Sequence, residues 1–177
     1  MRLIPAVVTV LLLSPAIARG QTCLVHGAAG PTVTDPGYSL AAGVGFSPTS
    51  RLTIVFSAER THLASQFRTY PEGFTAAFRG GTLTVAAAEM RFALLGRPRV
   101  GPYVLTGLAA GVSRPNVTRI FPTPVTNEVL ASFFGGGILV PLGDRLAVFA
   151  DARMMLAVGK EELLGLVPIR GGIAWHF

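Results

Sequence analysis

After residue 20, hydrophobic and polar positions alternate with a period of two, in segments rich in Val, Leu, Ile, Phe, Ala and Gly. Each segment ends at a turn or a polar loop. Because successive side chains of a β-strand point to opposite faces, this pattern predicts strands rather than helices. The predicted strands are residues 22–33, 38–47, 51–61, 81–95, 100–114, 128–141, 145–156 and 164–177. An all-β fold follows, and 22–33 is its least regular strand because it alternates poorly and contains Pro31.

The connections between these segments alternate between short turns and longer links. The short turns are residues 48–50, 96–99 and 142–144, and the longer links are 62–80, 115–127 and 157–163. Short turns at one end and long loops at the other are typical of transmembrane β-barrels, in which the short turns face the periplasm. Counting strand directions back from the C-terminus requires an upward strand at 22–33. The alternation therefore predicts a closed, antiparallel, up-and-down transmembrane β-barrel of eight strands.

The period of two also separates lipid-facing from inward-facing side chains. In the last segment Ile173, Trp175 and Phe177 share an apolar face, and Arg170 lies on the other. Charges in the remaining segments also fall opposite the apolar stripe, except Arg60 at a strand end. The predicted inward charges are Glu59, Glu89, Arg91, Asp151, Arg153 and Arg170. A cation facing lipid at the midplane costs about 2–4 kcal/mol, so we expect these charges to pair inside and fill the lumen.

The composition agrees with lipid-facing strands. The 177-residue chain is 50% hydrophobic and only 14% charged. Its longest apolar run, near residues 3–13, is shorter than the roughly 20 residues that a transmembrane helix needs. The hydrophobicity is therefore spread over short segments. The net charge of +6 comes without a Lys/Arg block, which argues against a nucleic-acid partner and fits basic loops beside anionic lipid headgroups.

The first 20 residues predict a secretory signal peptide, which leaves residues 21–177 as the barrel domain. Arg2 supplies the positive charge, an apolar run follows, and small residues precede the expected cleavage site before Gln21. Cleavage after Ala18 is the alternative. Export by this route directs the chain to the outer membrane of a Gram-negative-type cell.

Three stretches carry a resemblance to a known family. Residues 100–107 read VGPYVLTG, residues 140–153 combine PLGD with FADAR, and residues 169–177 end in IAWHF. They resemble the strand opening, a hairpin and the C-terminal signal of small bacterial outer-membrane β-barrels of the OmpA/OmpX and opacity-protein type. The resemblance covers about residues 38–177. The segment 22–33 departs from it, being more broken than the opening strand of the family.

This resemblance implies insertion by the barrel assembly machinery, contact with outer-membrane lipid and lipopolysaccharide, and a monomeric protein. We expect Tyr103, Trp175 and Phe177 at the periplasmic membrane interface, where amphipathic aromatic residues are favoured. Ile173, Trp175 and Phe177 match the terminal insertion signal.

The polar residues offer little for catalysis or metal binding. Glu59, His62 and Ser65 are spaced so that a serine-hydrolase triad is conceivable, although any polar loop supplies as much. The His-x-Ser pair of outer-membrane lipid A deacylases is absent. The three histidines and the single Cys23 show no zinc or iron spacing. We therefore expect no enzyme, no metal site and no cofactor.

The long links 62–80 and 115–127 are the remaining candidates for binding an extracellular ligand. They combine aromatic residues with Arg, which is typical of binding surfaces and equally suits loops lying among lipopolysaccharide headgroups. The candidate residues are Arg68, Tyr70, Phe74, Arg79, Arg119 and Phe121. The sequence predicts an outer-membrane protein with a structural or surface-interaction role. A narrow porin-like channel and a secreted lipocalin-like carrier are the alternatives.

Overall fold

The computed structural model describes residues 22–33, 35–69, 71, 73, 75–95, 100–117, 122–160 and 163–177. The predicted signal peptide lies outside these residues. Among them, all regular secondary structure is β-strand. No helix in this part of the chain is long and apolar enough to cross a membrane.

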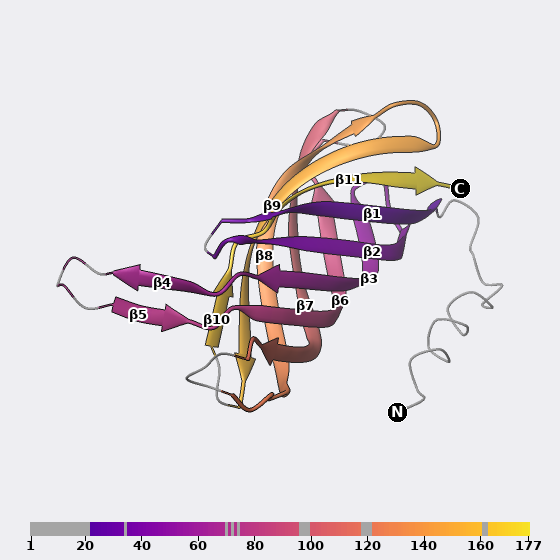
Figure 1. The fold of residues 1–177 in the computed structure, drawn as a ribbon. Helices are drawn as coiled ribbons and strands as arrows, with labels where there is room; N and C mark the ends of the chain where they lie inside the picture. The colour runs from indigo at the N-terminus through magenta and orange to yellow at the C-terminus, as the bar shows by residue number, and fades with distance from the viewer. Residues whose placement is uncertain are drawn as a thin grey trace.

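Eight of the described strands form one closed barrel. They are β1 (Thr22–Thr32), β2 (Gly37–Ser47), β3 (Leu52–Leu63), β6 (Gly81–Ala93), β7 (Gly101–Pro115), β8 (Asn127–Pro141), β9 (Leu146–Gly159) and β11 (Ile169–His176). Each strand pairs antiparallel with the next, and β11 pairs with β1, which closes the sheet (Figure 1). The predicted up-and-down barrel is confirmed. Its first strand, β1, is complete and pairs with β2 along its whole length.

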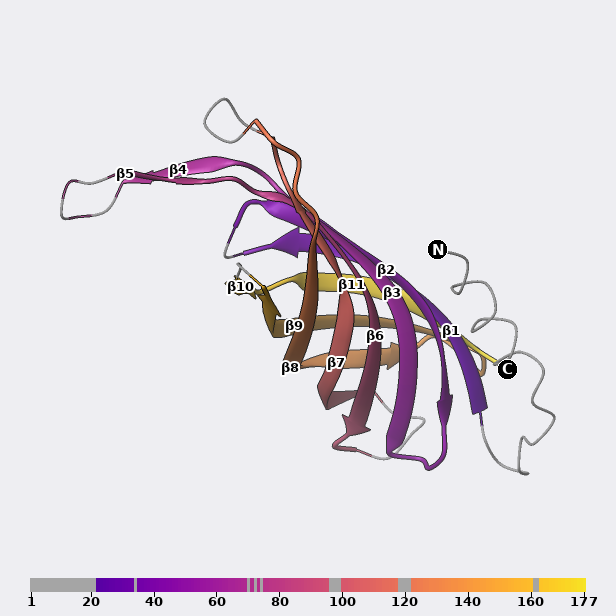
Figure 2. The ribbon, with the colours of Figure 1, turned by 90° about the horizontal axis from the view of Figure 1, so that it is seen from below.

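The short turns gather at one end of the barrel, which we call the turn end. The β2–β3 turn at 48–51 and the β8–β9 turn at 142–145 lie there, as do Thr22 and Phe177 (Figure 2). The opposite end, which we call the loop end, carries the connections 33–36, 64–80 and 116–126. The two longest connections, 64–80 and 116–126, therefore lie opposite the short turns, whereas the connection 33–36 at the loop end is as short as the turns themselves.

Three predicted segments differ from the structure. The link 157–163 is mostly strand, because β9 continues to Gly159 and a further strand begins at Leu163. The link 62–80 contains a hairpin of β4 (Gln66–Thr69) and β5 (Thr75–Phe78), which projects beyond the loop end (Figures 1 and 2). Two four-residue strands are too short to show an alternating pattern. The predicted strand 164–177 is two strands, β10 (Leu163–Leu166) and β11, because Pro168 has no N–H to continue the ladder.

Burial alternates along the strands as the period of two requires. In β6, Glu89 and Arg91 are 2% and 5% exposed, whereas Met90 between them is 50% exposed. The same alternation holds in β3, β9 and β11, and Arg60 is exposed. The core fills the lumen, while large apolar side chains coat the outside of the sheet. That coat includes Val25, Val44, Leu108, Leu130, Phe134, Ile138, Met154 and Ile173.

Candidate functional site: a charge network across the lumen

The six inward charges come from two opposite walls of the barrel. Glu59, Glu89 and Arg91 lie on the adjacent strands β3 and β6, while Asp151, Arg153 and Arg170 lie on the adjacent strands β9 and β11. Strands β1 and β2 separate the two walls on one side, and β7 and β8 separate them on the other. All six side chains are at most 5% exposed. Any contact between the two sets therefore crosses the lumen.

Arg170 makes the first such crossing. Its Nη1 lies 2.9 Å from Glu59 Oε2 on the opposite wall. On its own wall, Nε donates to Asp151 Oδ1 at 3.2 Å and Nη2 donates to Asp151 Oδ2 at 3.4 Å. Arg170 is directly paired with Asp151 in the β9–β11 register. One planar guanidinium thus holds a carboxylate beside it and another across the barrel, as the fork of an Arg side chain allows.

Arg153 makes the second crossing. Its Nη2 lies 2.9 Å from Glu89 Oε2 and 3.5 Å from Asp151 Oδ2, and its Nη1 lies 3.8 Å from Glu59 Oε2. The guanidinium carbon is 4.9 Å from the centre of the Phe133 ring, a distance at which a cation is attracted to the ring face. Arg153 therefore contacts the three acids of the network and one aromatic ring.

Arg91 completes the set on the β6 wall. Its Nε contacts Glu89 Oε1, and its guanidinium carbon lies 4.9 Å from the centre of the Phe149 ring and 5.7 Å from that of Tyr103. Three acids and three arginines make the network electrically balanced. Balance matters because an unpaired charge inside a barrel lacks both water and counter-ion.

Tyr103 belongs to this network and not to the membrane interface, which corrects the sequence prediction. It is 5% exposed, and its hydroxyl donates to Asp151 Oδ2 at 3.1 Å. It pairs with Gly137 on β8, where a Cβ would lie 2.8 Å from Tyr103 Cζ. Tyr103 occupies an inward-facing position of β7, and Gly137 leaves space for its ring. Because the hydroxyl is buried, it needs a hydrogen-bond partner, which Asp151 provides.

Two further lumen residues were missed from the sequence. Ser39 donates its hydroxyl hydrogen to Glu59 Oε1 at 3.0 Å. His26 is 3% exposed, its ring lies 6.0 Å from that of Phe149, and neither ring nitrogen has a hydrogen-bond partner among the described residues. His26 lies at an inward position of β1 and Ser39 at an inward position of β2. Assigning inward and outward positions along these two strands from the sequence would have identified both.

The other predicted site residues lie outside the charge network or outside the described residues. Ile173, Trp175 and Phe177 lie on the outer face of the barrel, and they follow one another toward the turn end. Arg68 falls in β4, and Tyr70, Phe74, Arg119 and Phe121 lie outside the described residues. Arg79 Nε donates to the Asn116 carbonyl at 3.3 Å.

Hydrogen bonds join the bases of the long connections at the loop end. Asn116 Nδ2 donates to Ser65 Oγ at 3.0 Å, and Ser65 Oγ donates to the Arg79 carbonyl. Gln66 Nε2 donates to Asp35 Oδ1 at 2.5 Å. The β4–β5 hairpin is therefore tied at its base to both neighbouring connections.

The residues considered for a hydrolase triad do not come together. Glu59 points into the lumen, His62 lies on the outer side against the Tyr38 ring at 5.4 Å, and Ser65 bonds at the loop end. Side chains alternate faces along a strand, so Glu59 and Ser65, at odd positions, and His62, at an even position, are not expected to converge; residues 59 and 62 of β3 face opposite sides of the sheet. Among the described residues, no group of three or more His, Cys, Asp or Glu side chains is placed to hold a metal ion.

Comparisons with known proteins identify the fold by structure alone. No protein-family model matches the sequence, and no curated protein matches it. The N-terminal β-barrel domain of Pseudomonas aeruginosa OprF is 12% identical with a TM-score of 0.61, covering 88% of this chain and 97% of that one. Neisserial surface protein A is 11% identical with a TM-score of 0.62, covering 89% and 96%.

A third solved structure, a major outer membrane protein from Thermus thermophilus, is 13% identical with a TM-score of 0.53 and covers 90% of this chain and 100% of that one. At these identities the likeness concerns the fold. The resemblance seen in the strand motifs is thereby confirmed: this chain has the fold of the small, OmpA/OmpX-like outer-membrane β-barrels.

Proposed function

We propose that this protein is an outer-membrane barrel with a structural or surface-interaction role, whose lumen is closed by the charge network. The observation that carries the proposal is the pair of crossings made by Arg170 and Arg153, which join opposite walls. The lumen of an eight-stranded barrel is only wide enough for side chains to fill. With these side chains packed across it, the barrel presents a braced wall instead of a pore.

The outer surface supports a membrane location. Leu108, Leu130 and Phe134 are 62%, 63% and 63% exposed on neighbouring strands. A coat of this kind is an aggregation liability in water, whereas a lipid-facing barrel requires it. A lipocalin-like carrier needs the reverse arrangement, with charges outside, and the six buried charges argue against that alternative.

The loop end supports an outward-facing role. By the rule that short turns face the periplasm, the β4–β5 hairpin and the connection 116–126 face the cell exterior. Their shared hydrogen bonds through Ser65, Arg79 and Asn116 hold the bases of both connections together. A joined base of this kind suits contact with an extracellular partner.

The location is tested by fractionating cells that express the full chain and comparing boiled with unboiled samples on gels. We expect the protein in the outer membrane, with faster migration before boiling because a closed barrel stays compact in detergent. A soluble periplasmic product without this shift would overturn the proposal.

Closure of the lumen by the charge network is tested separately, by recording currents across planar bilayers that contain the purified wild-type protein. We expect no discrete conductance steps. Regular steps from the wild-type protein would favour the narrow channel and would leave the membrane location standing.

A further inference from the structure

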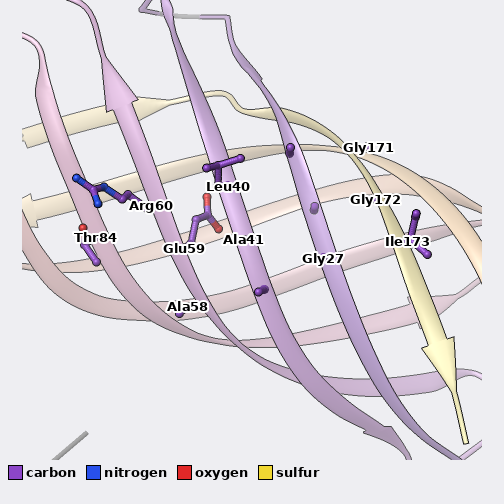
Figure 3. A pocket seen from close by; sticks show the side chains of 13 residues that line it. Gly27, Leu40, Ala41, Ala58, Glu59, Arg60, Thr84, Gly171, Gly172 and Ile173 are labelled. Atoms are coloured by element: carbon purple, nitrogen blue, oxygen red, sulfur yellow. The ribbon is translucent and has the colours of Figure 1, made fainter.

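The outer wall of the barrel has a hollow of about 810 Å³ over β11, β1, β2 and β3 (Figure 3). Small outward-facing residues from these four strands form its floor: Gly27, Ala29, Ala42, Ala58 and Gly171. Strand register explains the hollow. Gly27 pairs with Ala42, and Ala42 pairs with Ala58, so three small residues lie in one row across adjacent strands.

The floor is open to the outside of the barrel, and larger side chains border it. The next outward row toward the turn end is Val25, Val44 and Phe56, which pair in the same way. Ile173 bounds the hollow on the β11 side, while Leu40 and Arg60 bound it toward the loop end (Figure 3). The hollow therefore has an apolar floor and the guanidinium of Arg60 at its edge toward the loop end.

Arg60 is one of two arginines on the outer face at the loop end. The other is Arg114 on β7, and both are exposed. They are the only Lys or Arg residues on the outer face of the described barrel strands. Neither guanidinium makes a hydrogen bond or ion pair with any described residue, although both backbones are part of the strand ladders. Strand β6 lies between their strands, so the two backbones are about 10 Å apart across the sheet.

The partners of these two arginines in the adjacent strand β6 are uncharged, since Arg60 pairs with Thr84 and Arg114 pairs with Thr82. Glu128 is the only acid on the outer face of the described barrel strands. It pairs with Val112, which places it at the far end of the row of Arg60 and two positions along the ladder from Arg114, and it makes no ion pair with either arginine among the described residues. A cation at the edge of a membrane is most stable beside an anionic headgroup.

We propose that the hollow and the two arginines together bind a phosphorylated glycolipid of the outer leaflet, a lipid A-type molecule. An acyl chain fills the apolar floor, and phosphoryl oxygens accept hydrogen bonds from Arg60 and Arg114. The planar guanidinium matches phosphate in charge and in hydrogen-bond geometry. The inference rests on the proposed membrane location and adds a defined lipid site to it.

The test measures lipid bound to the purified, folded full-length barrel in detergent by native mass spectrometry. The probes are bisphosphorylated lipid A, the same lipid without its phosphates, and phosphatidylethanolamine. We expect the first to bind in preference to the other two. The double substitution Arg60→Gln and Arg114→Gln should weaken lipid A binding about 10-fold or more.

The matched control uses Arg51→Gln and Arg145→Gln, which remove two exposed arginines at the turn end. We expect this control to bind lipid A like the wild type. If the phosphate-free lipid binds equally well, or if both double variants lose binding to the same extent, the proposal is wrong.

The hollow is tested with Gly27→Leu, because a Cβ at Gly27 points into open space with its nearest atom 4.0 Å away. Filling the floor should weaken lipid A binding while the barrel still shows its heat-dependent gel shift. Unchanged binding would remove the hollow from the proposal. Arg60→Lys is a milder variant, which keeps the positive charge but loses the planar guanidinium. We expect it to bind lipid A with an affinity between those of the wild type and the double variant. It replaces the double variant if that protein fails to fold.

The two proposals fail in different ways. If the membrane location is wrong, the wild-type chain fractionates as a soluble protein. If only the lipid site is wrong, the wild-type chain still fractionates with the outer membrane and shifts on heating, and one of the contrary binding results described above is obtained.

Discussion

Arg170 and Glu59 are 111 residues apart in the sequence, yet Arg170 Nη1 donates to Glu59 Oε2 at 2.9 Å. The bond connects β11 with β3 across the lumen. Truncating Arg170 to Ala takes one of two nearby guanidinium groups away from the buried carboxylates of Glu59 and Asp151, which keep only the longer contacts with Arg153 at 3.8 and 3.5 Å. Breaking a buried pair in this way costs about 3–5 kcal/mol. We expect Arg170→Ala to lower the free energy of unfolding by that order, measured by urea titration in lipid vesicles. Arg51→Ala, which removes an exposed arginine at the turn end, is the control.

Arg153→Ala tests the other crossing. Arg153 contacts Glu89, Asp151 and Glu59, so its loss leaves three acids with fewer counter-charges. We expect the temperature at which the folded gel band disappears to drop clearly. An unchanged transition temperature would show that the network does not brace the barrel.

Tyr103→Phe tests the corrected position of this residue. The substitution removes one hydrogen bond to the Asp151 carboxylate, and a bond to a charged group contributes about 1.5–3 kcal/mol. Tyr38→Phe is the matched control, since Tyr38 is 52% exposed on the outer face. A Tyr103 that instead anchored the barrel in the interface would change membrane insertion and leave the unfolding free energy in detergent nearly unaltered.

Gly137→Ala tests the close approach beside Tyr103. A Cβ at this position would lie 2.8 Å from both Tyr103 Cζ and Asp151 Cβ, so the neighbours must move. Overpacking of this kind costs about 1–3 kcal/mol. Gly171→Ala, whose Cβ meets its nearest atom at 4.0 Å, should leave the unfolding transition where it is in the wild type.

His26→Leu tests a buried group that lacks partners among the described residues. Removing its ring nitrogens relieves their desolvation, and we expect a stability equal to the wild type or higher by about 1 kcal/mol. Ser39→Ala, which deletes a hydroxyl bonded to Glu59, should destabilise the barrel instead. A marked loss of stability in His26→Leu would reveal a partner for the ring.

Strand positions and faces were predictable from the sequence because the period of two is a local property. The alternation at Glu89, Met90 and Arg91 reports burial without knowledge of any neighbour. The lengths of the connections indicated the direction of each strand, and these directions required an additional strand at the position of β1. The β4–β5 hairpin and the break at Pro168 escaped because each depends on only a few residues.

The sequence alone determined which charges lie inside the barrel. Only the tertiary structure decided which of them meet. Arg170 reaches Glu59 because closure of β11 on β1 sets the two walls opposite each other, a relation that no local pattern contains. The same holds for Tyr103, whose partner Asp151 lies 48 residues away, and for the outer hollow, where the register of four strands aligns small residues beneath Arg60. Side-chain direction is a short-range property of the backbone, whereas register and closure are long-range.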